Sequence, residues 1–482
     1  MTFMLFNSLN YSIFLPLVYL LYWFVFNRNI TVRNIFLLSV SYVFYAFWDW
    51  RFVSLIILSS FVDYFIGLGM KNTPDNQHKR RKMLLVLSLI FNFGILGFFK
   101  YYNFFMDSFI EAFSFFGKDF NFTTLKIILP VGVSFYTFQS LSYTIDVFKK
   151  KCEPTTNLVN FLAFVCFFPQ LVAGPIERAK HMLPQFAEKK VFDYETTRSG
   201  LLLIVFGLFK KILIADRIAI FTNGVYKNLD GTSGISLVIA TLFFAFQLYL
   251  DFSAYSDIAI GTARLFGFKL VLNFRRPYFS GSFSEFWTRW HISLSSWFRD
   301  YLYFPLGGNR KGYIRTIVNV LIVFLLCGLW HGASWNFVIW GAINGLFIVV
   351  LDRIFKLEKS TGFKRVFGSI LVFLAWTLSL IFFRAPTFHD AIYVFQNIGF
   401  SGLDTIYNFG LNSSELRFAF YLIVGMMLFE LLIEKKGENL VQRFYATHFI
   451  LRWSVYLALV FSIIYLGSYG SFNDNSFIYF QF

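Results

Sequence analysis

The chain has 482 residues, of which 57% are hydrophobic and 15% are charged, and its formal net charge is +16. Soluble domains carry about 25% charged residues, so this composition excludes an ordinary soluble domain and indicates an integral membrane protein. The basic residues are spread over many short loops, which argues against nucleic-acid binding and fits basic cytoplasmic loops and anionic membrane lipids. Neither the three cysteines nor the histidines have metal-site spacing, so no metal or bound cofactor is expected.

Uncharged runs of about 17–25 residues recur along the chain and predict one all-α polytopic domain of about twelve spans, residues 1–482, with a catalytic core near 127–352. The first run has no basic residue before it, so it is expected to be a retained span and not a secretory signal. The apolar runs are Leu9–Phe26, Ile35–Trp48, Phe52–Met70, Leu84–Phe99, Ile127–Phe148, Leu201–Tyr226, Ile235–Leu250, Ile317–Leu351, Val366–Phe383, Phe418–Ile433 and Trp453–Leu466.

Basic loops set the expected orientation of these spans. The loop Lys71–Lys82 is rich in Lys and Arg and should be cytoplasmic, which places the N-terminus, and by alternation the C-terminus, outside. The apolar segment Leu158–Val172 is short and has basic residues on both sides. We therefore expect it to be re-entrant, with a break at Pro169 and at Gly174-Pro175.

Two regions mix charges with apolar sequence. Leu201–Tyr226 contains Lys210, Lys211, Asp216 and Arg217, which can pair, snorkel or line a cavity, and the sequence leaves the three open. The long basic segment Asp251–Arg315 is expected on the cytoplasmic side as short or interfacial helices.

The run Ile317–Leu351 contains no Asp, Glu, Lys or Arg, and His331 is its one titratable ring. The run is too long for one ordinary span, so we expect two helices that meet near Gly332. Counted from Arg315, His331 lies ~24 Å along the first helix, inside the membrane and nearer its far face. A polar ring at that depth favours a functional role, and a core histidine bonded to a backbone carbonyl is the alternative.

The segment Phe283–Phe298 is aromatic and predicts one amphipathic helix at a membrane boundary. Four of its residues share a face at i, i+3, i+4 and i+7, namely Trp287, Trp290, His291 and Leu294. His291 is either an interfacial histidine bonded to a neighbour or part of a site. The turn Pro305–Asn309 follows, and its two glycines allow close backbone approach. The remaining histidines are expected to be solvated or structural.

Long ordered motifs resemble those of the membrane-bound O-acyltransferase (MBOAT) family, and look most like its bacterial alginate O-acetyltransferase branch. They cover most of the chain. The motifs are Met4–Trp23, Leu129–Val147, Phe167–Phe186, Leu250–Phe268, Phe283–Gly312 and GLWHGASWNFVIWG at 328–341.

The resemblance implies a bacterial inner-membrane enzyme that moves an acyl group, most simply acetyl, from a cytoplasmic thioester to an extracytoplasmic hydroxyl. His331 matches the family's intramembrane histidine, and His291 matches a second polar position upstream. The donor is acetyl-CoA or an acyl carrier protein thioester. The final acceptor is an alginate-like polysaccharide or peptidoglycan, reached with a second, extracytoplasmic transferase protein.

In such a site a neutral His331 can act as general base on the acceptor hydroxyl, and an acyl-histidine intermediate is the alternative. Other expected substrate-binding residues are Trp330 and Trp335 as walls, Trp290, Asn309 in the glycine turn, and Arg299 as a cation for donor phosphates or for lipid. D-alanyl or longer acyl transfer stays open. So does a transporter or flippase of a lipid-linked sugar, which would not consume thioester through His331.

Overall fold

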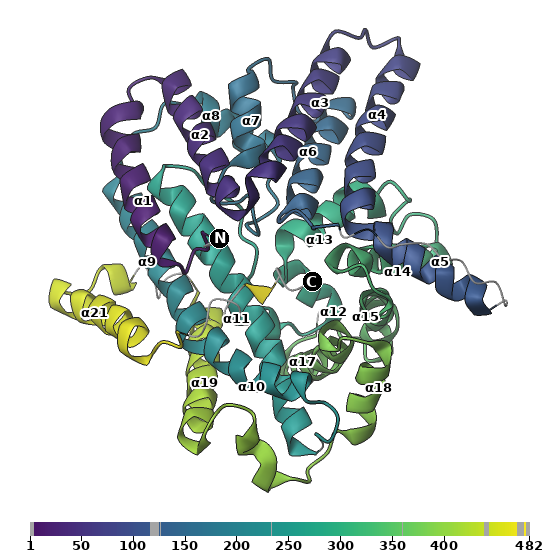
Figure 1. The fold of residues 1–482 in the computed structure, drawn as a ribbon, viewed down its shortest axis with the longest axis vertical. Coiled ribbons are helices and arrows are strands. Elements are labelled where there is room, and N and C mark those ends of the chain that lie inside the picture. Colours follow the sequence, from purple (N-terminus) through teal and green to yellow (C-terminus); the bar gives the residue numbers. More distant parts are fainter. Residues whose placement is uncertain are drawn as a thin grey trace. The chain divides into compact units, whose positions relative to one another are not determined.

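The computed structural model describes residues 4–115, 125, 127–232, 234–358, 360–437, 443–469 and 477–478. Its regular elements there are helices, with one isolated bridge between Gly234 and Ile398 (Figure 1). The chain divides into two compact units. Unit 1 comprises Met1–Gly200 and Ala259–Val271, and unit 2 comprises Leu201–Ile258 and Leu272–Phe482.

Unit 1 contains the helices of the N-terminal part of the chain. They are α1 (Leu9–Leu21), α2 (Ile30–Asp49), α3 (Val53–Lys71), α4 (His78–Leu96), α5 (Tyr102–Phe115), α6 (Val133–Phe148), α7 (Leu158–Cys166), α8 (Ala179–Ala187) and the start of α9 (Tyr194–Leu208). A buried carboxylate ties three of them together. Asp63 of α3 accepts hydrogen bonds from Ser88 Oγ (2.5 Å) and Asn92 Nδ2 (2.9 Å) of α4, and from Ser140 Oγ of α6.

Two predictions for unit 1 concern the lengths of apolar segments. The nine residues of α7 span only about 13.5 Å, less than half of the ~30 Å hydrocarbon thickness, in agreement with a segment that does not cross. The predicted span Ile127–Phe148 is shorter than expected, because α6 begins only at Val133. Pro130 precedes it, and Gly132 takes a left-handed conformation with φ 75°.

Unit 2 contains most of the remaining helices. They are the end of α9, α10 (Asp216–Lys227), most of α11 (Ile235–Leu265), α12 (Phe283–Arg289), α13 (Ile292–Phe298), α14 (Tyr313–His331), α15 (Trp335–Leu346), α16 (Asp352–Ile354), α17 (Gly362–Arg384), α18 (Phe388–Asn397), α19 (Ser413–Lys436) and α21 (Phe449–Leu466). Short π-helical turns continue several of them, at Phe209–Ala215, Arg299–Tyr303 and Phe347–Leu351.

The charges inside apolar sequence form buried ion pairs. Lys210 Nζ lies 2.7 Å from Asp257, and Lys211 Nζ lies 2.7 Å from both Asp216 and Asp251. Of the three possibilities, pairing is therefore the one observed for Lys210, Lys211 and Asp216. Arg217 instead donates to the carbonyl oxygen of Leu466 and stacks over Phe418.

The pairing of the two lysines also corrects the predicted end of the apolar run at Leu250. Asp251 and Asp257 are ion-pair partners of the two lysines, and α11 continues past them to Leu265. The prediction that the helix of Ile235–Leu250 ends before Asp251 is wrong.

Nine helical stretches in the described residues are long and apolar enough to cross a membrane. Two of them, Ile30–Lys71 and His78–Ser114, have 42 and 37 residues, enough length for more than one pass each. Large apolar side chains face outward from both units, such as Phe24 (71% exposed) and Phe363 (87% exposed). The predicted all-α polytopic membrane architecture is confirmed, and the count of about twelve spans stays a prediction.

The hairpin of α14 and α15 confirms the predicted break near Gly332. The first helix ends at His331 and the second begins at Trp335. The two helices pack along each other (Figure 1). Small residues permit this contact, because a Cβ on Gly328 would lie 2.1 Å from the carbonyl oxygen of Phe337. The backbones of the hairpin therefore touch, and this fixes the end of α14 that carries His331.

Candidate functional site

His331 lies inside an aromatic enclosure of unit 2. It is the last residue of α14 and is 4% exposed. Its ring centroid is 5.0 Å from that of Trp330, 5.1 Å from that of Trp340 on α15 and 5.6 Å from that of Phe383 on α17. The three rings stand edge-on to the imidazole. A titratable ring is thus held in an apolar environment that three helices build.

His291 lies at a break between two helices, so the prediction of one helix over Phe283–Phe298 is wrong. The first helix ends at Arg289, the second begins at Ile292, and His291 takes a left-handed conformation with φ 42°. The physical reason is a distant segment. The backbone N–H of Ile292 donates to the carbonyl oxygen of Asn273 (2.9 Å), which replaces the continuous helical ladder at this point.

The break brings the two candidate histidines together. His291 is fully buried, and its ring centroid lies 6.3 Å from that of His331 and 5.9 Å from that of Trp330. Trp290 is buried in the same aromatic cluster, with its ring centroid 4.9 Å from that of Trp376 on α17. Four of the expected site residues, two histidines and two tryptophans, therefore converge from separate stretches of sequence.

Asn273 is a buried polar neighbour of His291 that sequence reasoning missed. Its side-chain oxygen lies 3.1 Å from Nδ1 of His291. Burial lowers the pKa of His291 to about 3, so the imidazole is neutral at physiological pH. Nothing in the sequence around Asn273 marks it, because its contact joins two irregular segments 18 positions apart.

The other expected site residues lie elsewhere in unit 2. Trp335 opens α15 and is 56% exposed. Arg299 begins the π-helical turn after α13, forms an ion pair with Asp300 (3.0 Å) and stacks over Phe304. Asn309 is exposed in the turn that precedes α14. Arg299 does line a pocket, whereas Trp335 and Asn309 are solvent- or lipid-facing positions.

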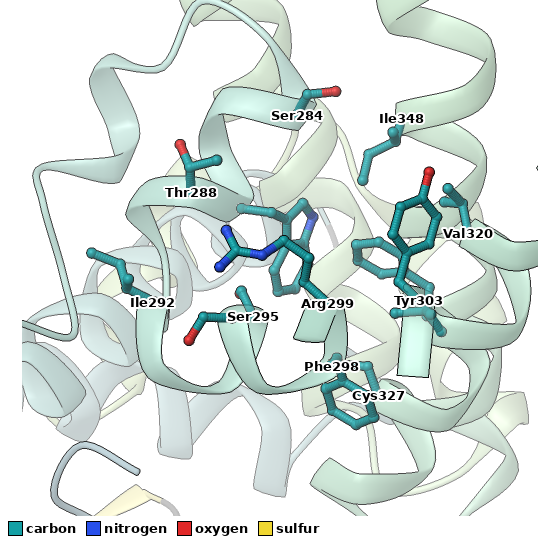
Figure 2. A pocket seen from close by; sticks show the side chains of 14 residues that line it. Ser284, Thr288, Ile292, Ser295, Phe298, Arg299, Tyr303, Val320, Cys327 and Ile348 are labelled. Atoms are coloured by element: carbon teal, nitrogen blue, oxygen red, sulfur yellow. The ribbon is translucent and has the colours of Figure 1, made fainter. Parts of the chain in front are cut away.

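That pocket has a volume of about 370 Å³ and lies beside α14 (Figure 2). Val320, Phe324 and Cys327 of α14 form an apolar wall, and Cys327 is one turn, about 6 Å, before His331. Figure 2 shows Thr288, Ile292 and Ser295 on one side of the pocket and Ile348, Val320 and Tyr303 on the other. Its polar lining residues are Ser284, Thr288, Ser295, Ser296, Arg299 and Tyr303.

A comparison with protein families matches residues 149–385 to the membrane-bound O-acyltransferase family. The chain is 39% identical over 383 residues to a probable alginate O-acetylase of Pseudomonas putida, an alignment that covers 79% of this chain and 76% of the relative. The chain belongs to the MBOAT family. It is also 35% identical over 421 residues to a peptidoglycan O-acetyltransferase of Helicobacter pylori, covering 81% of this chain and 79% of the relative.

A more distant relative is a teichoic acid D-alanyltransferase of Bacillus subtilis, 26% identical over 290 residues, covering 55% of this chain and 71% of the relative. As an MBOAT member the chain is a membrane O-acyltransferase. The region that matches the family contains His291, His331 and Asn273 together with the pocket. An acyl transfer site needs a base, and a buried neutral imidazole can act as one.

Proposed function

We propose that this chain transfers an acetyl group from a cytoplasmic thioester to a hydroxyl group of an extracytoplasmic polysaccharide or of peptidoglycan. The relatives that align over about four fifths of the chain are named O-acetylases and O-acetyltransferases. The D-alanyl-transferring relative aligns over 55% of it and at lower identity. Acetyl is therefore favoured over D-alanyl as the transferred group.

The observation that carries the proposal is the meeting of His331 and His291 in one buried aromatic enclosure, with 6.3 Å between the ring centroids. We assign His331 as the general base. As the acceptor oxygen attacks the thioester carbonyl, its proton passes to the neutral imidazole. A C–O bond forms, the C–S bond breaks, and the leaving thiolate receives the proton. General base assistance of this kind contributes ~10²–10⁴-fold to the rate.

The pocket beside α14 supplies a route for the donor. It follows the helix from Val320 to Cys327, about 10 Å, and ends one turn from His331. Apolar walls with scattered hydroxyl groups suit a thioester arm that carries amides. Arg299, which also lines the pocket, offers a positive charge for phosphate groups of acetyl-CoA or of a carrier protein.

The transfer is proposed to be two-sided, with the donor at the cytoplasmic face and the acceptor, or a second transferase protein, at the opposite face of the bacterial inner membrane. The support is the position of His331, ~24 Å along α14 from Arg315. Cysteines placed in Lys71–Lys82 should react with impermeant reagents from the cytoplasm only. The expected external marker, Ser471, lies outside the described residues.

The test uses purified full-length protein in proteoliposomes, with labelled acetyl thioester on one side and acceptor polysaccharide on the other. Label should reach the acceptor without leakage of the intact donor. His331→Ala and His331→Gln should lower transfer by ~10²-fold or more. His389→Ala, at an exposed position of α18, is the control and should retain full transfer.

Each contrary result has a defined meaning. Full transfer by His331→Gln would contradict proton transfer at this residue. Transfer that requires donor and acceptor on the same side would contradict the two-sided route. A preference for D-alanyl thioester over acetyl thioester would replace the proposed donor, and uptake of a lipid-linked sugar without thioester consumption would replace the enzymatic function.

A further inference from the structure

The side chain of Asn273 contacts both His291, at the helix break, and the start of α13. Asn273 is fully buried. Its Oδ1 atom lies 3.1 Å from Nδ1 of His291, 3.2 Å from the backbone nitrogen of Ser293 and 2.9 Å from Oγ of Ser293. Its Nδ2 atom donates to Oγ of Ser256 at 3.3 Å. One amide thus contacts the imidazole and the first turn of α13 at the same time.

The backbone contact decides which way the amide faces. A backbone N–H can only donate, so the atom of Asn273 that faces Ser293 N must be the oxygen. A rotation of the amide by 180° would set two donors against each other. Because the same oxygen faces Nδ1 of His291, a hydrogen bond forms there only when Nδ1 carries the proton. In a neutral imidazole the lone pair then lies on Nε2.

We propose that Asn273 is a positioning residue that holds His291 as the Nδ1–H tautomer, so that Nε2 of His291 serves as a hydrogen-bond acceptor during acyl transfer. The proposal rests on the proposed function, because it takes His291 to act on a substrate. It assigns His291 the role of a hydrogen-bond acceptor and specifies the kind of substrate group that it binds. A neutral His291 in this tautomer cannot donate from Nε2 to a thioester carbonyl oxygen, whereas it can accept from a substrate O–H or N–H group.

Ring packing alone would not select one tautomer of His291. Phe252 and Phe274 hold the plane of the His291 ring, with ring centroids 4.7 and 6.4 Å away. Aromatic contacts fix the position of a ring but leave its proton free to sit on either nitrogen. The amide oxygen of Asn273 distinguishes the two nitrogens, and the Ser293 backbone in turn fixes the amide.

The experiment reads the tautomer directly. Full-length protein is labelled with ¹⁵N-histidine, purified in detergent and studied by NMR without substrate. The chain has six histidines, and the His291 signals are those that His291→Gln removes. Wild-type protein should show a protonated Nδ1 and an unprotonated Nε2. Asn273→Asp, which keeps the acceptor oxygen, should retain the proton on Nδ1.

The decisive variant is Asn273→Leu, which keeps a side chain of similar length and removes the oxygen that accepts the hydrogen bond. It should shift His291 toward a mixture of tautomers and lower acetyl transfer at least about tenfold, which is part of the ~10²–10⁴-fold that acid–base assistance supplies. Asn273→Asp should recover part of that loss. Ser256→Ala is the matched control, because it removes only the far partner of Asn273 and should leave tautomer and transfer as in wild type.

The kinetic constants then separate the two possible substrate groups. In Asn273→Leu, a rise in the KM for the polysaccharide alone indicates that Nε2 accepts a hydrogen bond from the attacking hydroxyl group. A rise in the KM for the thioester alone indicates that Nε2 accepts from an amide N–H of the donor arm.

A proton on Nε2 in the wild type, or an unchanged tautomer in Asn273→Leu, overturns the positioning role. A changed tautomer with undiminished transfer overturns the role of Nε2 in catalysis. Full transfer by His291→Gln would contradict the action of His291 in the proposed function, and the wild-type spectrum would still test the tautomer.

Discussion

The contact between α14 and α15 predicts a specific cost for one added methyl group. In Gly328→Ala the new Cβ would lie 2.1 Å from the carbonyl oxygen of Phe337, whereas Cβ contacts below 3.0 Å are essentially never seen. The contact falls 0.9 Å short of that limit, the difference between 3.0 and 2.1 Å. A backbone oxygen cannot rotate away as a side chain can, so the two helices must separate by about that amount.

Two opposing effects set the magnitude. Overpacking of a well-packed interface costs about 1–3 kcal/mol, and a contact with rigid backbone belongs in the upper half of that range. Alanine in place of glycine inside a helix returns about 1 kcal/mol. We therefore expect Gly328→Ala to lower the free energy of unfolding by about 1–2 kcal/mol.

The same shift should reach the site. Trp340 on α15 packs against His331 with 5.1 Å between ring centroids, so a wider hairpin moves the imidazole relative to its enclosure. Misplacement of a reacting group by about 1 Å can cost ~10²-fold in rate. Acetyl transfer by Gly328→Ala should therefore fall by more than the loss of folded protein explains.

The assay measures the midpoint of thermal unfolding in detergent and acetyl transfer at a temperature where each variant is folded. Gly425→Ala on α19 is the matched control, because nothing lies within 4 Å of the added Cβ. It should be neutral or slightly stabilising. The reasoning is refuted if Gly328→Ala unfolds at the same temperature as Gly425→Ala and transfers acetyl at the wild-type rate.

Three further outcomes are expected. Since burial lowers the pKa of His291 to about 3, its ¹⁵N signals should stay those of a neutral ring between about pH 5 and pH 8. A titration of these signals in that pH range would contradict the lowered pKa. Lys211→Met leaves Asp216 and Asp251 buried without their shared cation and should destabilise unit 2 by about 3–5 kcal/mol, measured by thermal unfolding. Cys327→Trp fills the pocket beside α14 and should raise the KM for the thioester donor while the affinity for the acceptor stays unchanged.

The sequence was sufficient where a break or a polar residue interrupts an otherwise uniform pattern. His331 was found because it is isolated in Ile317–Leu351, and the hairpin was predicted because that run is too long for one span and contains Gly332. The break follows from chain length and local sequence, and needs no knowledge of distant contacts. For this reason the position of the turn between α14 and α15 agrees with the prediction.

The prediction failed where a distant partner overrides a local pattern. The periodicity of Phe283–Phe298 favours one helix, and neither glycine nor proline marks the break at His291. The carbonyl and side chain of Asn273 provide the bonds that stabilise the break, and they come from a segment that periodicity cannot connect to it. The end of α11 was misplaced for the same reason, because the partners of Asp251 lie on another helix.

Both histidines lie where a helix is interrupted, and this location has a physical basis. Inside a helix, side chains project from a continuous backbone ladder, and a ring at one position meets only what packs on that face. His331 ends α14 and His291 precedes α13, so each ring leaves its helix at a point where the chain changes direction. Such points need other bonds to replace the ladder. At His291 those bonds come from Asn273, the residue that also contacts its imidazole. Asn273 thus stabilises the break through its backbone carbonyl and its side-chain oxygen, and the same side-chain oxygen orients the histidine. Substitutions that remove this oxygen should therefore affect folding and transfer together.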